Sequence, residues 1–152
     1  MADPINLAGI DKVVERLKTV AREVKVTAAR KSLAKAARLI TNEAKAGAER
    51  SDDPKTGRKI SQNIQQRFAS KTFKQTGDVM YRIGVATARG PIPKGNPDEG
   101  PKGNTPQWHL IELGTEHAAA EPFLRPAGET KAQAAADVFM SELDKQLDKL
   151  LK

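Results

Sequence analysis

Apolar residues recur at three- and four-residue steps through the first third of the chain. The first series, which follows Asp3 and Pro4, is Leu7, Ile10, Val13, Val14, Leu17, Ala21 and Val24. It predicts an amphipathic helix from Pro4 to about residue 21, with Asp3 able to cap it. A second series keeps the same period from Val26 to Ala44. The β-branched stretch Val24–Thr27 lowers helix propensity locally, so one bent helix and two separate helices both remain open.

The C-terminal segment shows the clearest helical pattern. Its apolar face is Ala132, Ala135, Ala136, Phe139, Met140, Leu143, Leu147, Leu150 and Leu151, and acidic and basic residues alternate with these positions. This pattern predicts a long amphipathic helix that starts at Pro122 or at Pro126. No internal repeat is visible.

The middle of the chain changes to a two-residue period. Val79, Tyr81, Ile83 and Val85 alternate with less apolar residues, which is typical of a half-buried strand. Residues 67–74 are the expected partner strand, with a turn at residues 75–78. Residues 89–106 hold five prolines and four glycines, so they predict a long loop. The elements together predict an α+β fold with N-terminal helices, a central antiparallel hairpin or small sheet, and a long C-terminal helix.

The length of 152 residues fits one domain, which we expect to span residues 1–152 with 89–106 as a flexible loop. Only 4% of the residues are aromatic, so Ala, Leu, Ile and Val must build a lean core. The absence of cysteine excludes disulfides and Cys-based metal sites. No apolar run approaches the length of a membrane span, and the N-terminus lacks the pattern of a signal peptide. We therefore expect a soluble chain with no membrane partner.

Charge is distributed unevenly along the chain. The net charge is +7, and it divides into +9 for residues 1–76 and −2 for residues 77–152. Helical spacing gathers four cations on one side of the second predicted helix, namely Lys31, Lys35, Arg38 and Lys45. This stripe is a candidate contact for DNA or for another acidic partner. The chain contains no recognisable nucleic-acid module, so a solvated face or a protein contact is the simpler interpretation.

The sequence matches known catalytic and phosphate-binding motifs poorly. Gly90 and Gly95 have the spacing of a phosphate-binding loop but lack the Lys and Ser/Thr that should follow. His109, Glu112, Glu116 and His117 lie close in sequence, and on a continuous helix the first three would share a face, although Gly114 is expected to end that helix. His109, Glu112 and His117 form the one candidate for a metal-dependent hydrolase. We expect no enzymatic activity and no cofactor.

One segment after the loop has a distinctive composition. It runs from Trp108 to Ala127, and its Pro122 and Pro126 favour the start of the final helix while Phe123 and Leu124 anchor that start. Arg125 can pair with a carboxylate, and Glu112 is the candidate. The simplest interpretation is that this segment docks the C-terminal helix.

The same segment resembles a known family. The run Glu112-Leu-Gly-Thr115, followed by Pro122-Phe-Leu-Arg-Pro126 and a long final helix, is similar to the tail-completion, or head-tail joining (minor tail protein Z-like), proteins of lambda-like long-tailed bacteriophages. The order of the predicted elements agrees with that family over nearly the whole chain. The resemblance marks seven signature positions as determinants of fold and assembly: Glu112, Gly114, Thr115, Pro122, Phe123, Arg125 and Pro126.

The resemblance also implies a role. It implies a structural virion protein, made in the host cytoplasm, that forms a homo-oligomeric ring, a hexamer in that family, at the neck. Its expected partners are its own copies and adjacent neck, tail terminator, tail tube or head-connector proteins, with transient contact to threaded DNA. The alternative function is a small basic nucleic-acid-binding protein that uses Lys31, Lys35, Arg38 and Lys45.

Overall fold

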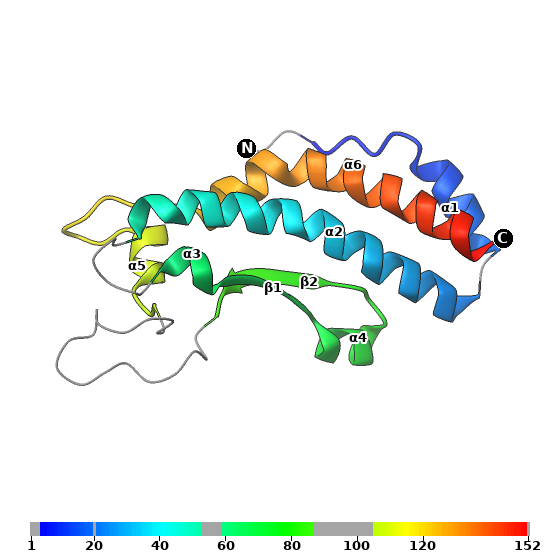
Figure 1. The fold of residues 1–152 in the computed structure, drawn as a ribbon, viewed down its shortest axis with the longest axis horizontal. Helices are drawn as coiled ribbons and strands as arrows, with labels where there is room; N and C mark the ends of the chain where they lie inside the picture. The colour runs from blue at the N-terminus through cyan, green and yellow to red at the C-terminus, as the bar shows by residue number, and fades with distance from the viewer. Residues whose placement is uncertain (1–3, 20, 53–58, 87–104, 152) are drawn as a thin grey trace. The chain divides into compact units, whose positions relative to one another are not determined.

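The structure is a computed structural model that describes residues 4–19, 21–52, 59–86 and 105–151. Its helices and its two-stranded sheet confirm the α+β class (Figure 1). The chain divides into two compact units. Unit 1 comprises Met1–Ile40, Gln66–Arg82 and Lys131–Lys152, and unit 2 comprises Thr41–Gln65 and Ile83–Thr130. The expected single domain stays a prediction, and most of the predicted 89–106 loop lies outside the described residues.

Helix α1 (Ile10–Lys18) begins later than the apolar pattern predicts. Gly9 has a φ of 86°, a left-handed conformation that a continuing right-handed helix cannot accommodate. Residues 4–7 have no regular secondary structure and residues 8–9 form a turn, and Asn6 is tied to Gln133 by two hydrogen bonds of 2.7 and 2.8 Å. The prediction of a helix from Pro4 is therefore wrong by about one and a half turns, and the capping role of Asp3 lies outside the described residues.

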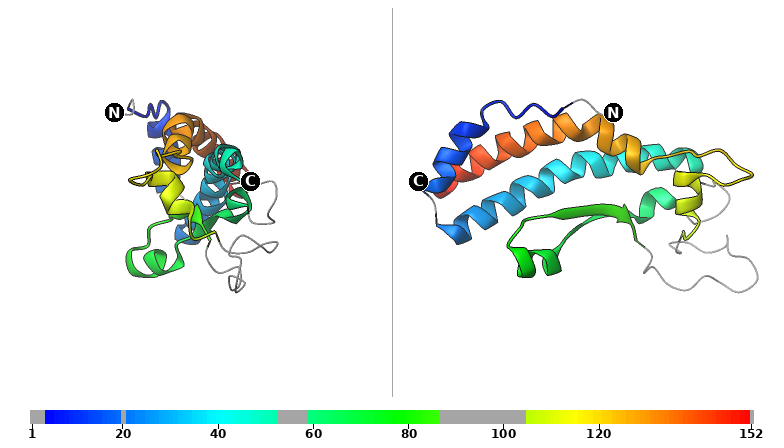
Figure 2. Two further views of the ribbon diagram at one scale, coloured as in Figure 1. Left: turned by 90° about the vertical axis from the view of Figure 1, so that its left-hand side faces the viewer. Right: turned by 180° about the vertical axis from the view of Figure 1, so that it is seen from behind.

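Helix α2 (Arg22–Ala48) starts after a break that follows α1, so the two apolar series form separate helices. Within unit 1, α1 and α2 lie alongside the later part of α6 (Leu124–Leu150) (Figures 1 and 2), and the three helices share a core cluster. Its buried members are Val13, Ala28, Leu143 and Leu147, flanked by Leu17, Val24, Phe139 and Met140. Arg16 adds ion pairs to Asp144 and to Asp148, which lie one turn apart on α6. The predicted C-terminal helix is confirmed, and it begins at Leu124, between the two prolines that the sequence offered as its start.

The sheet pairs β1 (Ile64–Phe68) with β2 (Tyr81–Val85). The predicted second strand is confirmed, but its partner lies three residues earlier than expected, because Ser70–Thr76 forms helix α4. In unit 1 the ring of Phe68 lies 5.7 Å from Phe73 of α4 and 5.6 Å from Tyr81. A helical turn brings Phe73 back to this cluster, whereas a continuing strand would carry it away. The predicted turn at 75–78 is accordingly the end of α4 and the residues that follow it.

Unit 2 holds the short elements: η1 (Glu49–Ser51), α3 (Ile60–Asn63) and α5 (Trp108–Leu113), together with the ends of α2 and α6 that belong to it. Its buried apolar side chains are Ala44, Ala48, Ile60, Ile64, Phe123 and Ala127. The side chains of Asn63 and Thr105 are also buried and share a 2.9 Å hydrogen bond. This small core surrounds the first turn of α6, where the distinctive segment of the sequence lies.

Candidate functional site

Glu112 joins α5 to the start of α6. Its carboxylate accepts hydrogen bonds from three consecutive backbone N–H groups, those of Phe123 at 2.7 Å, Leu124 at 3.0 Å and Arg125 at 3.0 Å. The first four N–H groups of an α-helix have no partner within the helix. Glu112 serves three of them here, and the fourth position is Pro126, which has no N–H to satisfy. We call this arrangement the Glu112 clasp.

The charge state of Glu112 fits this role. Its side chain is buried, with 7% of the residue exposed, and burial by itself raises the pKa of the carboxyl group. The three backbone hydrogen bonds and the positive charge of Arg125 act in the opposite direction and prevail, so the pKa lies below its ordinary value. Glu112 is therefore an ionised helix cap at neutral pH. A carboxylate with this much coordination is poorly placed to transfer protons.

Gly114 and Thr115 shape the turn that follows α5. Gly114 ends the helix, as the sequence predicts, with φ 77° and ψ 173°, and a Cβ there would lie 2.8 Å from the backbone N of Ala120. The Thr115 hydroxyl then accepts hydrogen bonds from the N–H groups of His117 and Ala118. The chain returns so that the N–H of Glu121 reaches the carbonyl of Ile111 at 2.8 Å. This return brings Phe123 to the carboxylate of Glu112.

The remaining signature residues divide between core and surface. Phe123 is 2% exposed and is the largest fully buried side chain among the described residues. Pro122 and Pro126 are partly buried, and Arg125 is exposed. The sequence suggested an ion pair between the Arg125 guanidinium and Glu112, but the hydrogen bond comes from the backbone N–H of Arg125. The side chain contributes only its field to the pKa of Glu112.

The four cations of the predicted stripe all lie on α2 but have different surroundings. Lys31 and Arg38 are exposed, Lys45 is partly buried, and Lys35 forms a 2.8 Å ion pair with Glu142 of α6. Lys35 is thus already neutralised within the chain. Lys31, Lys35 and Arg38 belong to unit 1 and Lys45 to unit 2.

The candidate metal site receives no support. Within the described ranges, no group of three His, Asp or Glu side chains is placed to hold a metal ion. Glu112 faces the N–H groups of α6, whereas His109 and His117 are exposed. The helical geometry that would place His109, Glu112 and Glu116 on one face ends at Gly114. In the structure, Glu112 is a helix cap, and both histidines lie on the surface.

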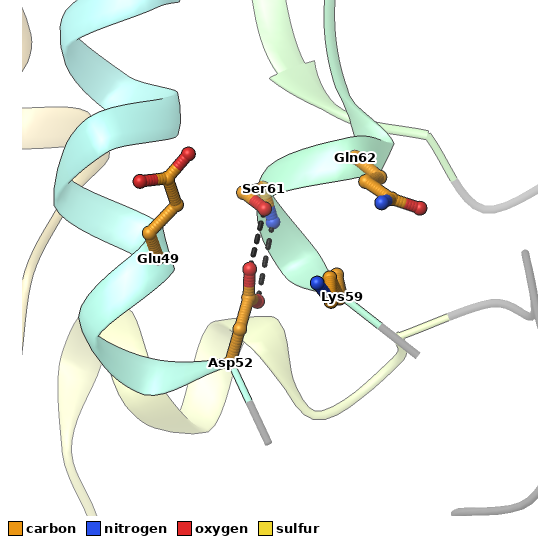
Figure 3. A pocket seen from close by; sticks show the side chains of 5 residues that line it. All are labelled: Glu49, Asp52, Lys59, Ser61 and Gln62. Carbon is orange, nitrogen blue, oxygen red and sulfur yellow. Dashed lines mark hydrogen bonds between the residues drawn. The ribbon is translucent and has the colours of Figure 1, made fainter. Parts of the chain in front are cut away.

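Asp52 forms a second carboxylate cap, which the sequence did not predict. Asp52 accepts a hydrogen bond from the N–H of Ile60 at 2.6 Å. It also accepts hydrogen bonds from the N–H of Ser61 at 3.3 Å and from the Ser61 hydroxyl (Figure 3). It lies at a cavity of about 370 Å³ whose other lining residues are Glu49, Lys59 and Gln62. Both carboxylate oxygens of Asp52 accept hydrogen bonds from α3, so the Asp52 side chain at this cavity is a helix cap. In the sequence, Asp52 is only an acidic residue eight positions before Ile60, which is too weak a signal to predict this cap.

Comparison with known proteins identifies the family. A family model described as "Bacteriophage HK97-gp10, putative tail-component" matches residues 11–114, and neither a curated protein nor a solved structure matches the chain. The match includes Glu112 and Gly114 and stops before the other signature positions. In the part of the chain that is described, no helix has the length and apolar character needed to cross a bilayer. Because the match covers residues from α1 through α5, the chain belongs to the HK97-gp10-like family of bacteriophage tail components.

Proposed function

We propose that this chain completes the tail of a long-tailed phage, or joins the tail to the head, as a homo-oligomeric ring at the neck. Membership of a phage tail-component family makes it a structural protein of the virion, and this is the observation that carries the proposal. The neck position and the hexameric ring extend it through the resemblance of residues 112–126 to tail-completion proteins. Adjacent neck, tail terminator, tail tube or head-connector proteins are the proposed neighbours.

The distribution of charge supports self-association. A ring is built from a heterologous contact, in which two different surfaces of each copy meet. Unit 1 holds 17 Lys/Arg and 9 Asp/Glu, a net charge of +8, whereas unit 2 holds 9 and 10, a net charge of −1. Opposite charge on the two contributing surfaces steers association and selects the register of the contact. The Glu112 clasp fixes the start of α6, and we propose that it and the other signature residues hold the shape that assembly requires.

Particles assembled without this chain test the proposed function. In the phage that encodes it, deletion of its gene should leave heads and tails unjoined, or tails without a finished end, as seen by electron microscopy. Expression of the intact chain from a plasmid should restore complete particles. Complete infectious particles in the absence of the chain would contradict the proposal.

Contact with DNA is a second and lesser role. Lys31 and Arg38 are exposed and, among the described residues, have no ion-pair partner, so these two could meet phosphates of DNA that threads the neck. Phosphate binding falls steeply as salt rises. Titration of the purified chain with duplex DNA at low and moderate salt should therefore show weak, salt-sensitive binding. Replacement of Lys31 and Arg38 by alanine should reduce it, and equal binding by that variant would remove this role.

A further inference from the structure

Two arginines lie directly opposite each other on the β1–β2 hairpin. The N–H of Ala69 donates to the carbonyl of Met80 at 2.9 Å, so these two residues lie opposite each other. In an antiparallel pair, a residue two positions before Ala69 then lies opposite the residue two positions after Met80. Arg67 and Arg82 are such a pair, and both are exposed. Cross-strand partners have Cβ atoms about 4.5–5.5 Å apart, and like charges at that separation destabilise a sheet. The pair thus favours a carboxylate supplied from elsewhere.

The opposite face of the hairpin is already covered within unit 1. Gln66 donates to the carbonyl of Ala34 on α2 at 2.9 Å, and Arg30 of α2 lies 4.0 Å from the centre of the Phe68 ring. Side chains alternate along a strand, so Arg67 and Arg82 lie on the face away from α2. Met80 shares that face and is 39% exposed. We call these three residues, Arg67, Met80 and Arg82, the hairpin face.

No described carboxylate neutralises the hairpin face. Residues 66–82 carry four Lys/Arg and one Asp. That aspartate, Asp78, accepts a 2.8 Å hydrogen bond from the Thr76 hydroxyl. Arg82 has one long hydrogen bond, 3.4 Å, to the Thr72 hydroxyl, and Arg67 forms no ion pair within the described part of the chain. The hairpin face is an apolar side chain with two unneutralised guanidinium groups.

Unit 2 presents a surface of complementary character. Leu110 and Leu113 lie three residues apart on α5 and are 46% and 66% exposed. Glu116 follows in the turn held by the Thr115 hydroxyl, is exposed, and has no ion-pair partner among the described residues. Residues 105–130 carry four Glu and one Arg, the reverse of the balance in residues 66–82. We call Leu110, Leu113 and Glu116 the α5 edge.

We infer that the hairpin face of one copy binds the α5 edge of the next copy. Met80 packs against Leu110 and Leu113, and Arg67 and Arg82 share the carboxylate of Glu116. The contact is heterologous, so repetition closes a ring or continues as a filament. The inference rests on the proposed self-association and names the two surfaces that perform it.

Complementary charge reversal tests this contact in the full-length chain. The first variant is Arg67→Glu with Arg82→Glu, and the second is Glu116→Arg. Each alone places like charges together, so self-association should weaken at least about tenfold. An equal mixture should recover the oligomer, because each surface then meets its opposite in alternating copies. Native mass spectrometry gives the masses, and circular dichroism checks that both variants fold.

A control variant separates the effect of charge at the proposed contact from the effect of the net charge of the chain. Lys12→Glu with Lys149→Glu changes the net charge by the same amount at exposed positions of α1 and α6, outside the hairpin face and the basic stripe, and it should keep the wild-type oligomer. If the first variant keeps the wild-type mass, the inferred contact is wrong and the proposed ring can still stand. If the wild-type chain stays monomeric both alone and with tail tubes, the proposed ring and this contact both fail. Loss of duplex-DNA binding with unchanged mass would assign the hairpin face to DNA instead.

Discussion

The carboxylate of Glu112 accepts a hydrogen bond from the buried backbone N–H of Phe123 at 2.7 Å, across eleven positions of sequence. The same carboxylate serves the next two residues, so one side chain on α5 caps the first turn of α6. Phe123 in turn is 2% exposed and fixes this turn in the core of unit 2. The relationship explains why glutamate, phenylalanine and proline occur together in this segment.

Replacing Glu112 by glutamine should destabilise the chain. The amide keeps the shape of the side chain but removes the charge and directs an NH₂ group toward backbone donors. Leaving buried N–H groups without a good acceptor costs about 1–3 kcal/mol, which a urea unfolding curve would measure. Glu129→Gln, an exposed position on α6, is the matched control and should change stability by less than about 0.5 kcal/mol. Equal stability of the two variants would show that the clasp contributes nothing.

The contribution of Glu112 should depend on pH. Its pKa is lower in the folded chain than in the unfolded chain, because the backbone hydrogen bonds and Arg125 outweigh burial. The stabilisation is therefore present above the unfolded pKa and is lost as the pH falls through the folded pKa. The difference in unfolding free energy between wild type and Glu112→Gln should be largest near neutral pH and shrink in acid. A difference that is constant across this range would be inconsistent with a lowered pKa.

Replacing Gly114 by alanine should be costly. The combination of φ 77° and ψ 173° is nearly restricted to glycine, and the new Cβ would lie 2.8 Å from the N of Ala120. We expect a loss of about 1–3 kcal/mol in thermal or chemical unfolding. Gly128→Ala is the control, because Gly128 lies in α6 with open space around it and should stabilise by about 0.4–1 kcal/mol. Opposite signs for the two variants are the required result.

Truncation of Leu147 should test the core of unit 1. Leu147 is 0% exposed and belongs to the cluster with Val13 and Ala28. Leu147→Ala should cost about 2–5 kcal/mol, since it removes buried methyl groups and leaves a cavity. Leu150→Ala, in the same helix but 44% exposed, should cost far less. Similar losses in urea unfolding for both variants would mean that α6 is not packed as described.

The spacing of apolar residues along the chain predicted most of the regular elements. Period and spacing located α2, α6 and β2, because a helix or strand that buries one face must repeat apolar residues at its own period. They failed where a single residue or a distant contact outweighs the pattern. Gly9 interrupts an apolar series that continues through it, and the contacts of Phe73 favour α4 over a longer strand. Nothing in the local sequence distinguishes these cases.

The candidate site was also predicted in part from the sequence and decided in part by the structure. The sequence singled out residues 112–126, ended the helix at Gly114, and named Glu112 as the carboxylate that meets Arg125. It assigned that contact to the Arg125 side chain, since charge is visible in a sequence and backbone direction is not.

The sequence by itself therefore determined the α+β class, the helical periods, the family resemblance and the uneven charge. The tertiary structure decided which groups satisfy one another: the N–H groups of α6 on Glu112, those of α3 on Asp52, and Lys35 on Glu142. It also placed Arg67 opposite Arg82. The physical reason is that periodicity reports the burial of a face, a property of neighbouring residues, whereas hydrogen bonds and charge pairs depend on distances between segments far apart in the chain.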